Sequence, residues 1–245
     1  MPFLKSIRLN GEGGSYPFEI PSIRSLFGVN LELHPKVTFF VGENGSGKST
    51  LLEGIADKWG FAAQSGNRSQ TPGLRNYETA LAHDLVISKS IGIRPMDGFF
   101  LRAESLYNFA SELEALEQEP FCASGYFAYG GKSLHEQSHG ESFFSIFMNR
   151  FDGHGLFMLD EPEAALSTKR QMSFLVRMHD LCEDSSQFII ATHSPILLAY
   201  PEAIIYEFTE DGIRQVDYKE TEAYRLTKRF VDEPEQMIRR LLESD

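Results

Sequence analysis

Residues 42–50 read Gly-Glu-Asn-Gly-Ser-Gly-Lys-Ser-Thr and fit the pattern G-x-x-x-x-G-K-[ST] of a phosphate-binding loop, the P-loop. The preceding run, Lys36–Val41, is rich in β-branched and aromatic residues and predicts a buried strand. The following run, Ser49–Ile55, has the apolar spacing of a helix. Strand, glycine loop and helix follow in the order that a P-loop requires. This context argues against a coincidental glycine turn and predicts an α/β fold that binds ATP or GTP.

The chemistry of this loop follows from its expected geometry. Glycines let the backbone turn so that successive N–H groups face the phosphates, and the N-terminus of the helix adds a partial positive charge. We expect Lys48 to reach the β and γ phosphates and Ser49 to hold Mg²⁺. The predicted nucleotide-binding residues of the loop are Gly42, Glu43, Asn44, Gly45, Ser46, Gly47, Lys48, Ser49 and Thr50.

A second segment, Gly155–Pro162, is an apolar strand that ends in two carboxylates, Asp160 and Glu161. A Walker B segment has this form, with one acid in the Mg²⁺ shell and the next beside the attacking water. We therefore predict Asp160 as a metal residue and Glu161 as a catalytic residue that positions or deprotonates water. A strand that ends in a solvated acidic turn is the alternative, and the presence of a P-loop makes it less favoured.

His193 follows another strand-like run, Gln187–Thr192. Open α/β sheets keep their ligand sites at the carboxyl ends of the strands. We therefore predict that His193 contacts the γ phosphate and is catalytic, although a lone histidine is more often a structural hydrogen-bonding residue.

The P-loop, Asp160-Glu161-Pro162 and Thr192-His193-Ser194 occur in an order that resembles the ATP-binding-cassette (ABC) ATPases. The resemblance covers nearly the whole chain. It is closest to small bacterial AAA-group ATPases with an ABC-type core, which are related to the SMC and RecF-like ATPases of chromosome maintenance and repair. It implies an ABC-ATPase head architecture, with a mainly parallel core sheet, an N-terminal antiparallel β layer and a small helical lobe. ATP and Mg²⁺ are the implied cofactors.

The family places a signature loop, Leu-Ser-Gly-Gly-Gln in transporters, shortly before Walker B, and here residues 137–142 read Gln-Ser-His-Gly-Glu-Ser. The resemblance implies that Ser138 and Gly140 bind the γ phosphate of an ATP held by another subunit, so that ATP joins a homodimer. The same string read alone is a helix cap with an acidic first turn. Its place in the chain favours the signature loop.

Two further family elements are incomplete. Residues 163–167 resemble the D-loop, but Ser167 stands where the final acid is usual. No glutamine follows the strand-like run Gly98–Arg102, so Glu104 is the candidate for the metal and water contact of the glutamine loop. Arg102 is an alternative phosphate or interface contact, and a solvated helix start is the alternative for either residue. For recognition of the base, the N-terminal candidates are Arg8, Asn10, Tyr16 and Phe18, which packing of an amphipathic hairpin explains equally well.

The composition limits the organisation of the chain. With 245 residues, 42% hydrophobic content and 20 phenylalanines, the chain can bury a core of its own. We expect one ABC-type ATPase domain over 1–245, with a helical lobe at approximately 67–145 between the P-loop and Walker B. Residues 220–243 alternate apolar and charged residues and predict amphipathic helices interrupted at Pro234, which core packing would explain.

Charge and cysteine content restrict the environment and partners. No segment approaches ~18 uninterrupted apolar residues, and residues 1–6 lack the pattern of a signal peptide, so we expect a cytoplasmic protein. The two cysteines, Cys122 and Cys182, lie far apart and predict free thiols. A net charge of −12 at pH 7 argues against strong, non-specific binding of nucleic acid by the monomer.

Two functional classes fit these observations. The first is a soluble, stand-alone ATPase that acts on a protein effector or a nucleic acid. The second is the nucleotide-binding subunit of an ABC transporter. The run Glu141–Arg150 lacks the basic, alanine-rich character typical of transporters, and the glutamine loop that meets a membrane partner is missing, so we favour the first class. An ATP-binding switch without turnover is a third class, and an intact Glu161 argues against it.

Overall fold

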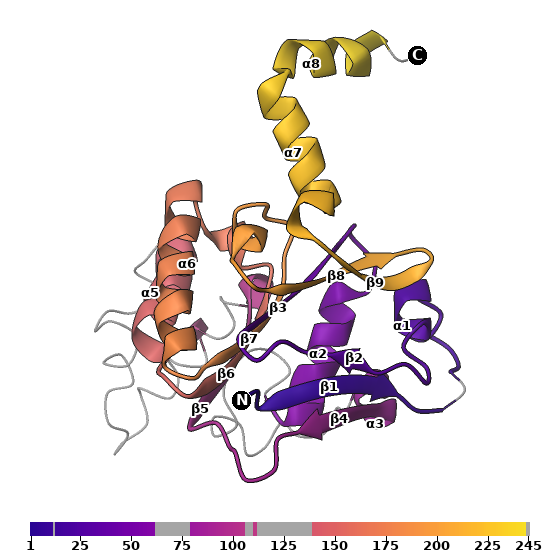
Figure 1. Ribbon diagram of the computed structural model, residues 1–245, viewed down its shortest axis with the longest axis vertical. Helices are drawn as coiled ribbons and strands as arrows, with labels where there is room; N and C mark the ends of the chain where they lie inside the picture. Colours follow the sequence, from indigo (N-terminus) through magenta and orange to yellow (C-terminus); the bar gives the residue numbers. More distant parts are fainter. Residues whose placement is uncertain (12, 62–78, 106–109, 112–138, 244–245) are drawn as a thin grey trace.

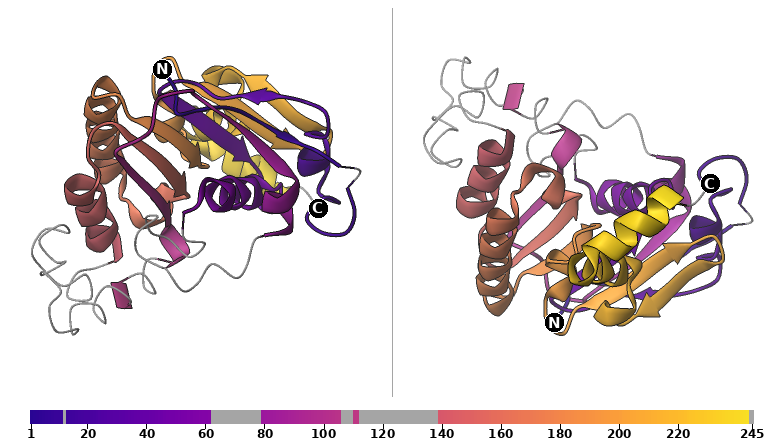
Figure 2. Two further views of the ribbon diagram at one scale, coloured as in Figure 1. Left: turned by 90° about the horizontal axis from the view of Figure 1, so that it is seen from below. Right: turned by 90° about the horizontal axis from the view of Figure 1, so that it is seen from above.

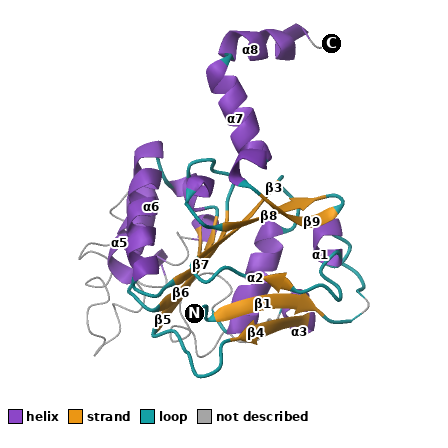
Figure 3. Ribbon diagram, viewed as in Figure 1, coloured by secondary structure: helices purple, strands orange, loops and turns teal. Residues whose placement is uncertain are grey.

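A six-stranded sheet forms the centre of the computed structural model, which describes residues 1–11, 13–61, 79–105, 110–111 and 139–243 (Figures 1 and 3). Its strand order is β5-β6-β7-β3-β8-β9. The first five strands run parallel, and β9 pairs antiparallel with β8. The strands are β3 (Val37–Gly42), β5 (Asp97–Arg102), β6 (Gly155–Asp160), β7 (Gln187–Ala191), β8 (Ile204–Thr209) and β9 (Gly212–Val216).

A second, three-stranded sheet lies beside the core sheet and is antiparallel throughout, in the order β2-β1-β4. Its strands are β1 (Leu4–Leu9), β2 (Leu31–Glu32) and β4 (Leu85–Lys89). The predicted fold class, with a mainly parallel core and an antiparallel layer that begins at the N-terminus, is confirmed. The layer differs from the expectation in two details: its third strand comes from β4, and the short helix α1 (Pro21–Arg24) interrupts the N-terminal segment.

Each face of the core sheet packs against a different layer, because successive side chains of a strand point to opposite faces. Phe39 and Phe157 belong to the cluster on one face, together with α5 and α6, whereas Phe40 and Met158 belong to the cluster on the other face, together with α2 and the antiparallel sheet. Figure 2 shows α2 on one side of the core strands and α5 and α6 on the other. The helices of these layers are α2 (Lys48–Trp59), α3 (Ala80–Asp84), α5 (His139–Arg150) and α6 (Thr168–Glu183), and short 3₁₀ turns are η1 (Ala103–Ser105), η4 (Pro162–Ala165), η5 (Leu197–Ala199) and η6 (Tyr218–Glu220).

The range 67–145, expected to form a helical lobe, contains two strands. β4 belongs to the antiparallel sheet and β5 to the core sheet, so this part of the range is not a helical lobe. The sequence run Gly98–Arg102 itself predicts the second of these strands, so a helical lobe can occupy only part of the range 67–145. Most of residues 106–138 lies outside the described part of the chain, and the single-domain organisation stays a prediction.

The C-terminal helices lie where the sequence predicted them, but they do not pack into the core. α7 (Glu222–Asp232) and α8 (Pro234–Glu243) are separated at Pro234, as expected. They project from the domain (Figure 1), and neither helix has a buried residue. Val231 is 70% exposed and Leu242 is 79% exposed. The expectation that core packing explains this segment is therefore wrong, because an amphipathic pattern specifies an apolar face but not what covers it. In the described part of the chain, no helix combines the length and apolar content that crossing a membrane requires.

Substitutions in the core and in the C-terminal helices should differ strongly in their effect on the free energy of unfolding. Phe157 is fully buried and its ring stacks on Phe151 at a centroid distance of 4.3 Å, whereas Phe230 is 43% exposed. Phe157→Ala should lower the free energy of unfolding by about 3–5 kcal/mol, because it opens a cavity. Phe230→Ala should change it by less than ~0.5 kcal/mol. Urea titration followed by the fluorescence of Trp59, the single tryptophan, measures both. Equal losses would show that α7 packs against the domain in solution.

Candidate functional site

Four neighbouring parallel strands bring the predicted site residues to one edge of the core sheet. The register pairs Arg102 of β5 with Asp160 of β6, Asp160 with Ala191 of β7, and Ala191 with Phe40 of β3. Each strand therefore ends at the same level. The P-loop follows β3, Glu161 follows β6, and Thr192 and His193 follow β7. Carboxyl ends of parallel strands are the usual place for a ligand site in such sheets.

The backbone of the P-loop has a shape that other residues would disturb. Gly42 has a φ of 148°, and a Cβ there would lie 2.4 Å from the carbonyl oxygen of Phe208. Gly47 has a φ of 99°, and a Cβ would lie 2.9 Å from the hydroxyl of Ser22. That hydroxyl donates a hydrogen bond to the carbonyl oxygen of Ser46, so α1 supports the loop from outside. The glycines are needed for the turn and for the close packing around it.

Lys48 begins α2 and lies inside the loop, where it is only 3% exposed. Its ammonium group donates hydrogen bonds to the carbonyl oxygens of Gly42 and Glu43, at 2.9 and 2.8 Å. Burial lowers the pKa of Lys48, and the nearby carboxylates of Glu161 and Asp160 oppose this effect. Carbonyl oxygens of the P-loop thus hold the ammonium inside the loop, within a cradle of the kind that binds phosphate. The buried Ser46 hydroxyl has no hydrogen-bond partner among the described residues, so it is free to bind a ligand.

Ser49 and Asp160 form the candidate metal site. The Ser49 hydroxyl donates a hydrogen bond to Oδ1 of Asp160 at 2.8 Å, and Asp160 is 4% exposed. Nε of Arg102 donates to Oδ2 of Asp160 at 2.9 Å, and the same guanidinium contacts Glu53 at 3.1 Å. Burial raises the pKa of Asp160, against the lowering effects of Ser49 and Arg102.

A hydroxyl and a carboxylate are oxygen donors of the kind that Mg²⁺ prefers. Within the described residues, no group of three His, Cys, Asp or Glu side chains could hold a metal alone. Mg²⁺ takes most of its ligands from water and substrate phosphates and needs few from the protein. Ser49 and Asp160 therefore fit Mg²⁺. Their assignment as its ligands stays a prediction.

Glu161 and His193, both predicted to be catalytic, lie side by side. Nε2 of His193 is 3.5 Å from Oε1 of Glu161, and both side chains are partly exposed. Glu161 has a φ of 50°, which is uncommon for a residue with a side chain and is typical of functional sites. A hydrogen bond of 2.9 Å from its backbone N–H to the carbonyl oxygen of Ala191 holds this conformation.

The environment of His193 favours the neutral imidazole. Burial lowers the pKa of His193, and the positive charge of Lys48 lowers it further, while Glu161 opposes both effects. Among the described residues, Nε2 has no hydrogen-bond partner. A neutral imidazole beside a carboxylate can accept or donate a hydrogen bond to a phosphate or to water.

The signature-loop residues are only partly described. Ser138 lies outside the described residues, and Gly140 lies in the first turn of α5. A Cβ at Gly140 would be 2.4 Å from the carbonyl oxygen of Ala165, so this turn packs closely against η4, which follows Glu161. Ser167, expected in place of the D-loop acid, caps α6 by accepting a hydrogen bond from the backbone N–H of Arg170. The phosphate contacts of Ser138 and Gly140 stay predictions.

The structure separates the other weak candidates. Glu104 lies exposed in η1, and Arg102 is the residue of this segment that contacts Asp160. Phe18 lies in the turn segment between β1 and α1, where it is buried and packs against Phe27, so core packing explains it without a hairpin, whereas Tyr16 is 68% exposed. Sequence reasoning missed Ser22 and Glu53, and it placed Glu163 in the D-loop-like segment without its contact to the His193 loop. Only Glu163 had a signal, because it is the third acid of the run Asp160-Glu161-Pro162-Glu163.

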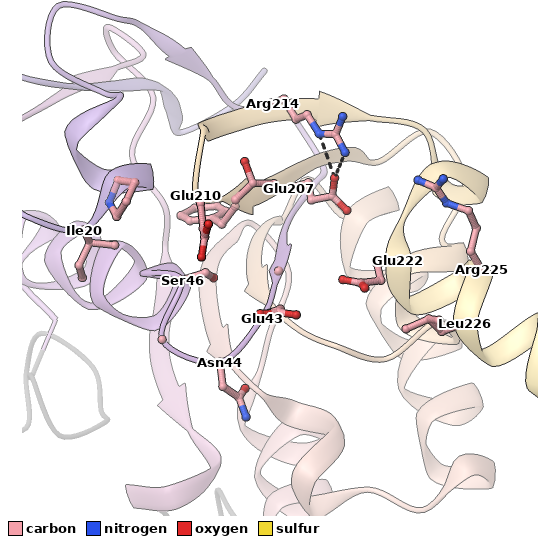
Figure 4. A pocket seen from close by; sticks show the side chains of 15 residues that line it. Ile20, Glu43, Asn44, Ser46, Glu207, Glu210, Arg214, Glu222, Arg225 and Leu226 are labelled. Carbon is pink, nitrogen blue, oxygen red and sulfur yellow. Dashed lines mark hydrogen bonds and ion pairs between the residues drawn. The ribbon is translucent and has the colours of Figure 1, made fainter. Parts of the chain in front are cut away.

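A cavity of about 1120 Å³ adjoins the outer side of the P-loop (Figure 4). Glu43 and Ser46 of the loop line it, together with Arg225 and Leu226 of α7. On the β8–β9 hairpin, Nε of Arg214 donates to Glu207 at 3.0 Å, as the dashed lines show. This volume is large enough for a nucleotide-sized ligand.

Two families of AAA domains match the chain. One, described as an AAA domain, matches residues 19–104, which contain the P-loop. The other, an AAA domain described in connection with the AbiEii toxin of type IV toxin–antitoxin systems, matches residues 135–199, which contain Walker B and His193. Together, the two matches include the P-loop, Walker B and His193, which the fold brings to one edge of the core sheet.

Individual relatives are more distant. The replication and repair protein RecF of Colwellia psychrerythraea is 56% identical over 34 residues, which are 14% of this chain and 9% of RecF. The macrolide export protein MacB of Psychrobacter cryohalolentis is 26% identical over 228 residues, which are 83% of this chain and 32% of MacB. The chain thus spans about a third or less of the curated relatives it matches. The solved structure of an ABC transporter of metal-chelate type, in an inward-facing conformation, has a TM-score of 0.50 at 15% identity and covers 91% of this chain and 88% of that chain. This likeness shows the fold.

The surroundings of His193 predict that its imidazole titrates below the ordinary value of 6.5. NMR of the imidazole resonances, assigned with His193→Asn, measures the midpoint. Because the unfolded chain binds this proton more readily, the free energy of unfolding should fall as the pH drops from 6.5 through the lower pKa of the folded protein. Lys48→Met removes the nearby positive charge and should move the midpoint back toward 6.5. A midpoint at or above 6.5 in the unaltered protein would contradict the burial and charge argument.

Proposed function

We propose that this chain, an AAA/ABC-type P-loop ATPase by its two AAA-domain matches, binds ATP with Mg²⁺ and hydrolyses the β–γ phosphoanhydride bond with water. One observation carries the proposal. The Ser49 hydroxyl contacts Asp160 at 2.8 Å, which joins the P-loop to Walker B at the sheet edge where Glu161 and His193 also lie.

Each side chain has a role that its position supports. The Lys48 ammonium, already inside the loop, supplies positive charge to the β and γ phosphates. Glu161 orients the attacking water and accepts its proton, and neutral His193 hydrogen-bonds the γ phosphate. Bound Mg²⁺ would neutralise charge on the phosphate oxygens, and Ser49 and Asp160 would hold it. The products are ADP and inorganic phosphate.

We further propose that two copies of the chain join around ATP. The signature-like residues Ser138 and Gly140 would bind the γ phosphate of ATP on the opposite copy. Within one copy, Gly140 packs against Ala165, so the first turn of α5 is in contact with the segment that follows Glu161. A protein effector or a nucleic acid is the proposed target of the cycle.

A transporter subunit is the second candidate. The MacB similarity favours it, since it extends over 83% of this chain. We favour the stand-alone ATPase for two reasons. The helix after the signature-like loop, Glu141–Arg150, lacks the basic, alanine-rich character typical of transporters, and Arg102 stands near the place of the missing glutamine. A cytoplasmic location and action without a membrane partner are part of this proposal.

Two variants test hydrolysis. Lys48→Ala should abolish ATP binding, measured with a fluorescent ATP analogue, because the cradle loses its cation. Glu161→Gln should keep binding and lower kcat by about 100-fold or more, since water positioning is lost. Lys228→Ala, which alters an exposed lysine of α7, is the matched control and should change neither. Lys48 also bonds the loop carbonyls, so thermal unfolding must show that Lys48→Ala still folds. Equal binding by the Lys48 and Glu161 variants would overturn the assignment.

The dimer has its own test. Glu161→Gln protein should change from monomer to dimer by light scattering when Mg-ATP is added. Adding Ser138→Arg to the same variant should leave ATP binding intact and prevent dimerisation, because the larger, charged side chain would lie against the nucleotide of the other copy. A dimer that persists with Ser138→Arg would show that Ser138 serves as a helix cap only.

A further inference from the structure

The third acid of the run Asp160-Glu161-Pro162-Glu163 has a different environment from the first two. Asp160 contacts Ser49 and Arg102, and Glu161 lies beside the imidazole of His193. Glu163 instead lies in η4 and contacts the backbone of the loop that carries His193. We infer that Glu163 is a positioning residue, which fixes His193 for hydrolysis by accepting a hydrogen bond from its backbone N–H. This inference rests on the proposed ATPase function and deepens it.

The contact joins two loops that are distant in sequence. The backbone N–H of His193 donates to Oε1 of Glu163 at 2.5 Å. In the opposite direction, the backbone N–H of Glu161 donates to the carbonyl oxygen of Ala191 at 2.9 Å. The segment after β6 is therefore bonded once to the last residue of β7 and once to the loop that follows β7. Because Glu161 and His193 belong one to each segment, these bonds set the 3.5 Å separation of their side chains.

A short hydrogen bond to a carboxylate is stronger than one between neutral groups, so this contact is a firm constraint. Burial raises the pKa of Glu163, and the hydrogen bond from the His193 backbone is the leading effect in the other direction. The second oxygen, Oε2, is buried and has no partner among the described residues. An unpaired buried oxygen costs stability, so apolar packing alone does not explain a carboxylate here. The hydrogen bond that Oε1 accepts from the His193 backbone N–H explains it.

The residue after His193 is fixed from another element. The Ser194 hydroxyl donates to Oε1 of Gln171 in α6 at 2.6 Å, and the backbone N–H of Ser194 donates to the Thr192 hydroxyl at 3.0 Å. The loop is thus held on both sides, by Gln171 at residue 194 and by Glu163 at residue 193. The backbone N–H of Thr192 also donates to the carbonyl oxygen of Phe40 at 3.0 Å. Without Glu163 the loop would therefore stay held at residues 192 and 194, and His193 between them would lose its own backbone hydrogen bond. Displacements of about 1 Å in such groups can lower rates by about 100-fold.

Substitutions at Glu163 distinguish a role as hydrogen-bond acceptor from a role that depends on its negative charge. Glu163→Ala removes the acceptor and should lower kcat for ATP by about 10- to 100-fold, with KM changed by less than about twofold. Glu163→Gln keeps an amide oxygen in the same place and should restore kcat to within about threefold of the unaltered protein. Glu183→Ala, an exposed acid of α6, is the control and should behave like the unaltered protein. Unchanged kcat in Glu163→Ala would overturn the inference. So would equal loss in the Ala and Gln variants, because it would mean that the charge matters and the acceptor does not.

A second measurement does not depend on hydrolysis. Hydrogen exchange of the His193 backbone amide, followed by NMR without nucleotide, should be about tenfold faster or more in Glu163→Ala and near the original rate in Glu163→Gln. Unchanged exchange in Glu163→Ala would overturn the inference even if the ATPase function holds. If the unaltered protein does not hydrolyse ATP, the proposed function fails, and the exchange result still decides whether Glu163 fixes the loop. Thermal unfolding of both variants checks that the fold is intact.

Discussion

The hydrogen bond from the Ser49 hydroxyl to Asp160 is the contact on which the rest of the site depends, because it joins the first turn of α2 to the end of β6. Neither residue could reach the other without the parallel register of the core sheet, which brings the ends of β3, β7 and β6 to one level. The glycines of the P-loop then let the chain turn back over this edge. The apolar side chains of β3, β6 and β7 are buried, so these strands cannot slip without exposing them, and the core thereby fixes the positions of the polar groups at the edge.

The side chains at this edge carry more negative than positive charge, which restricts the kind of ligand that can bind there. Among the described side chains around it, the carboxylates of Glu53, Asp160, Glu161 and Glu163 face the cations Lys48 and Arg102, and Arg102 is already paired with two of them. A triphosphate adds further negative charge. Such a ligand would be repelled unless it arrived with a cation of its own. The electrostatics therefore favour a nucleotide with a bound divalent ion over a free phosphate compound, and the oxygen donors of Ser49 and Asp160 suit such an ion.

Local sequence patterns predicted the parts of the site that lie within one strand and the turn after it. The P-loop, the acidic end of β6 and His193 were each recognised from a few adjacent residues, and β7 and β3 were recognised as strands. The contact between Glu163 and His193 could not be predicted in this way, because it depends on the relative positions of two loops that only the sheet register determines. The exposure of α7 and α8 also escaped prediction, since their apolar spacing is the same whether the apolar face is covered or open.

Arg102 stands near the place where the family resemblance leads us to expect a glutamine. The glutamine expected near this place would offer an amide, whereas the guanidinium contacts Asp160 and Glu53 together. Asp160 is thereby bonded on one oxygen by Ser49 and on the other by Arg102, which fixes the plane of the carboxylate. An isolated buried carboxylate would be costly, and two donors reduce that cost without neutralising the group by protonation. Because a carboxylate that is already oriented loses little freedom when it binds a cation, the pairing with Arg102 prepares Asp160 for its proposed role.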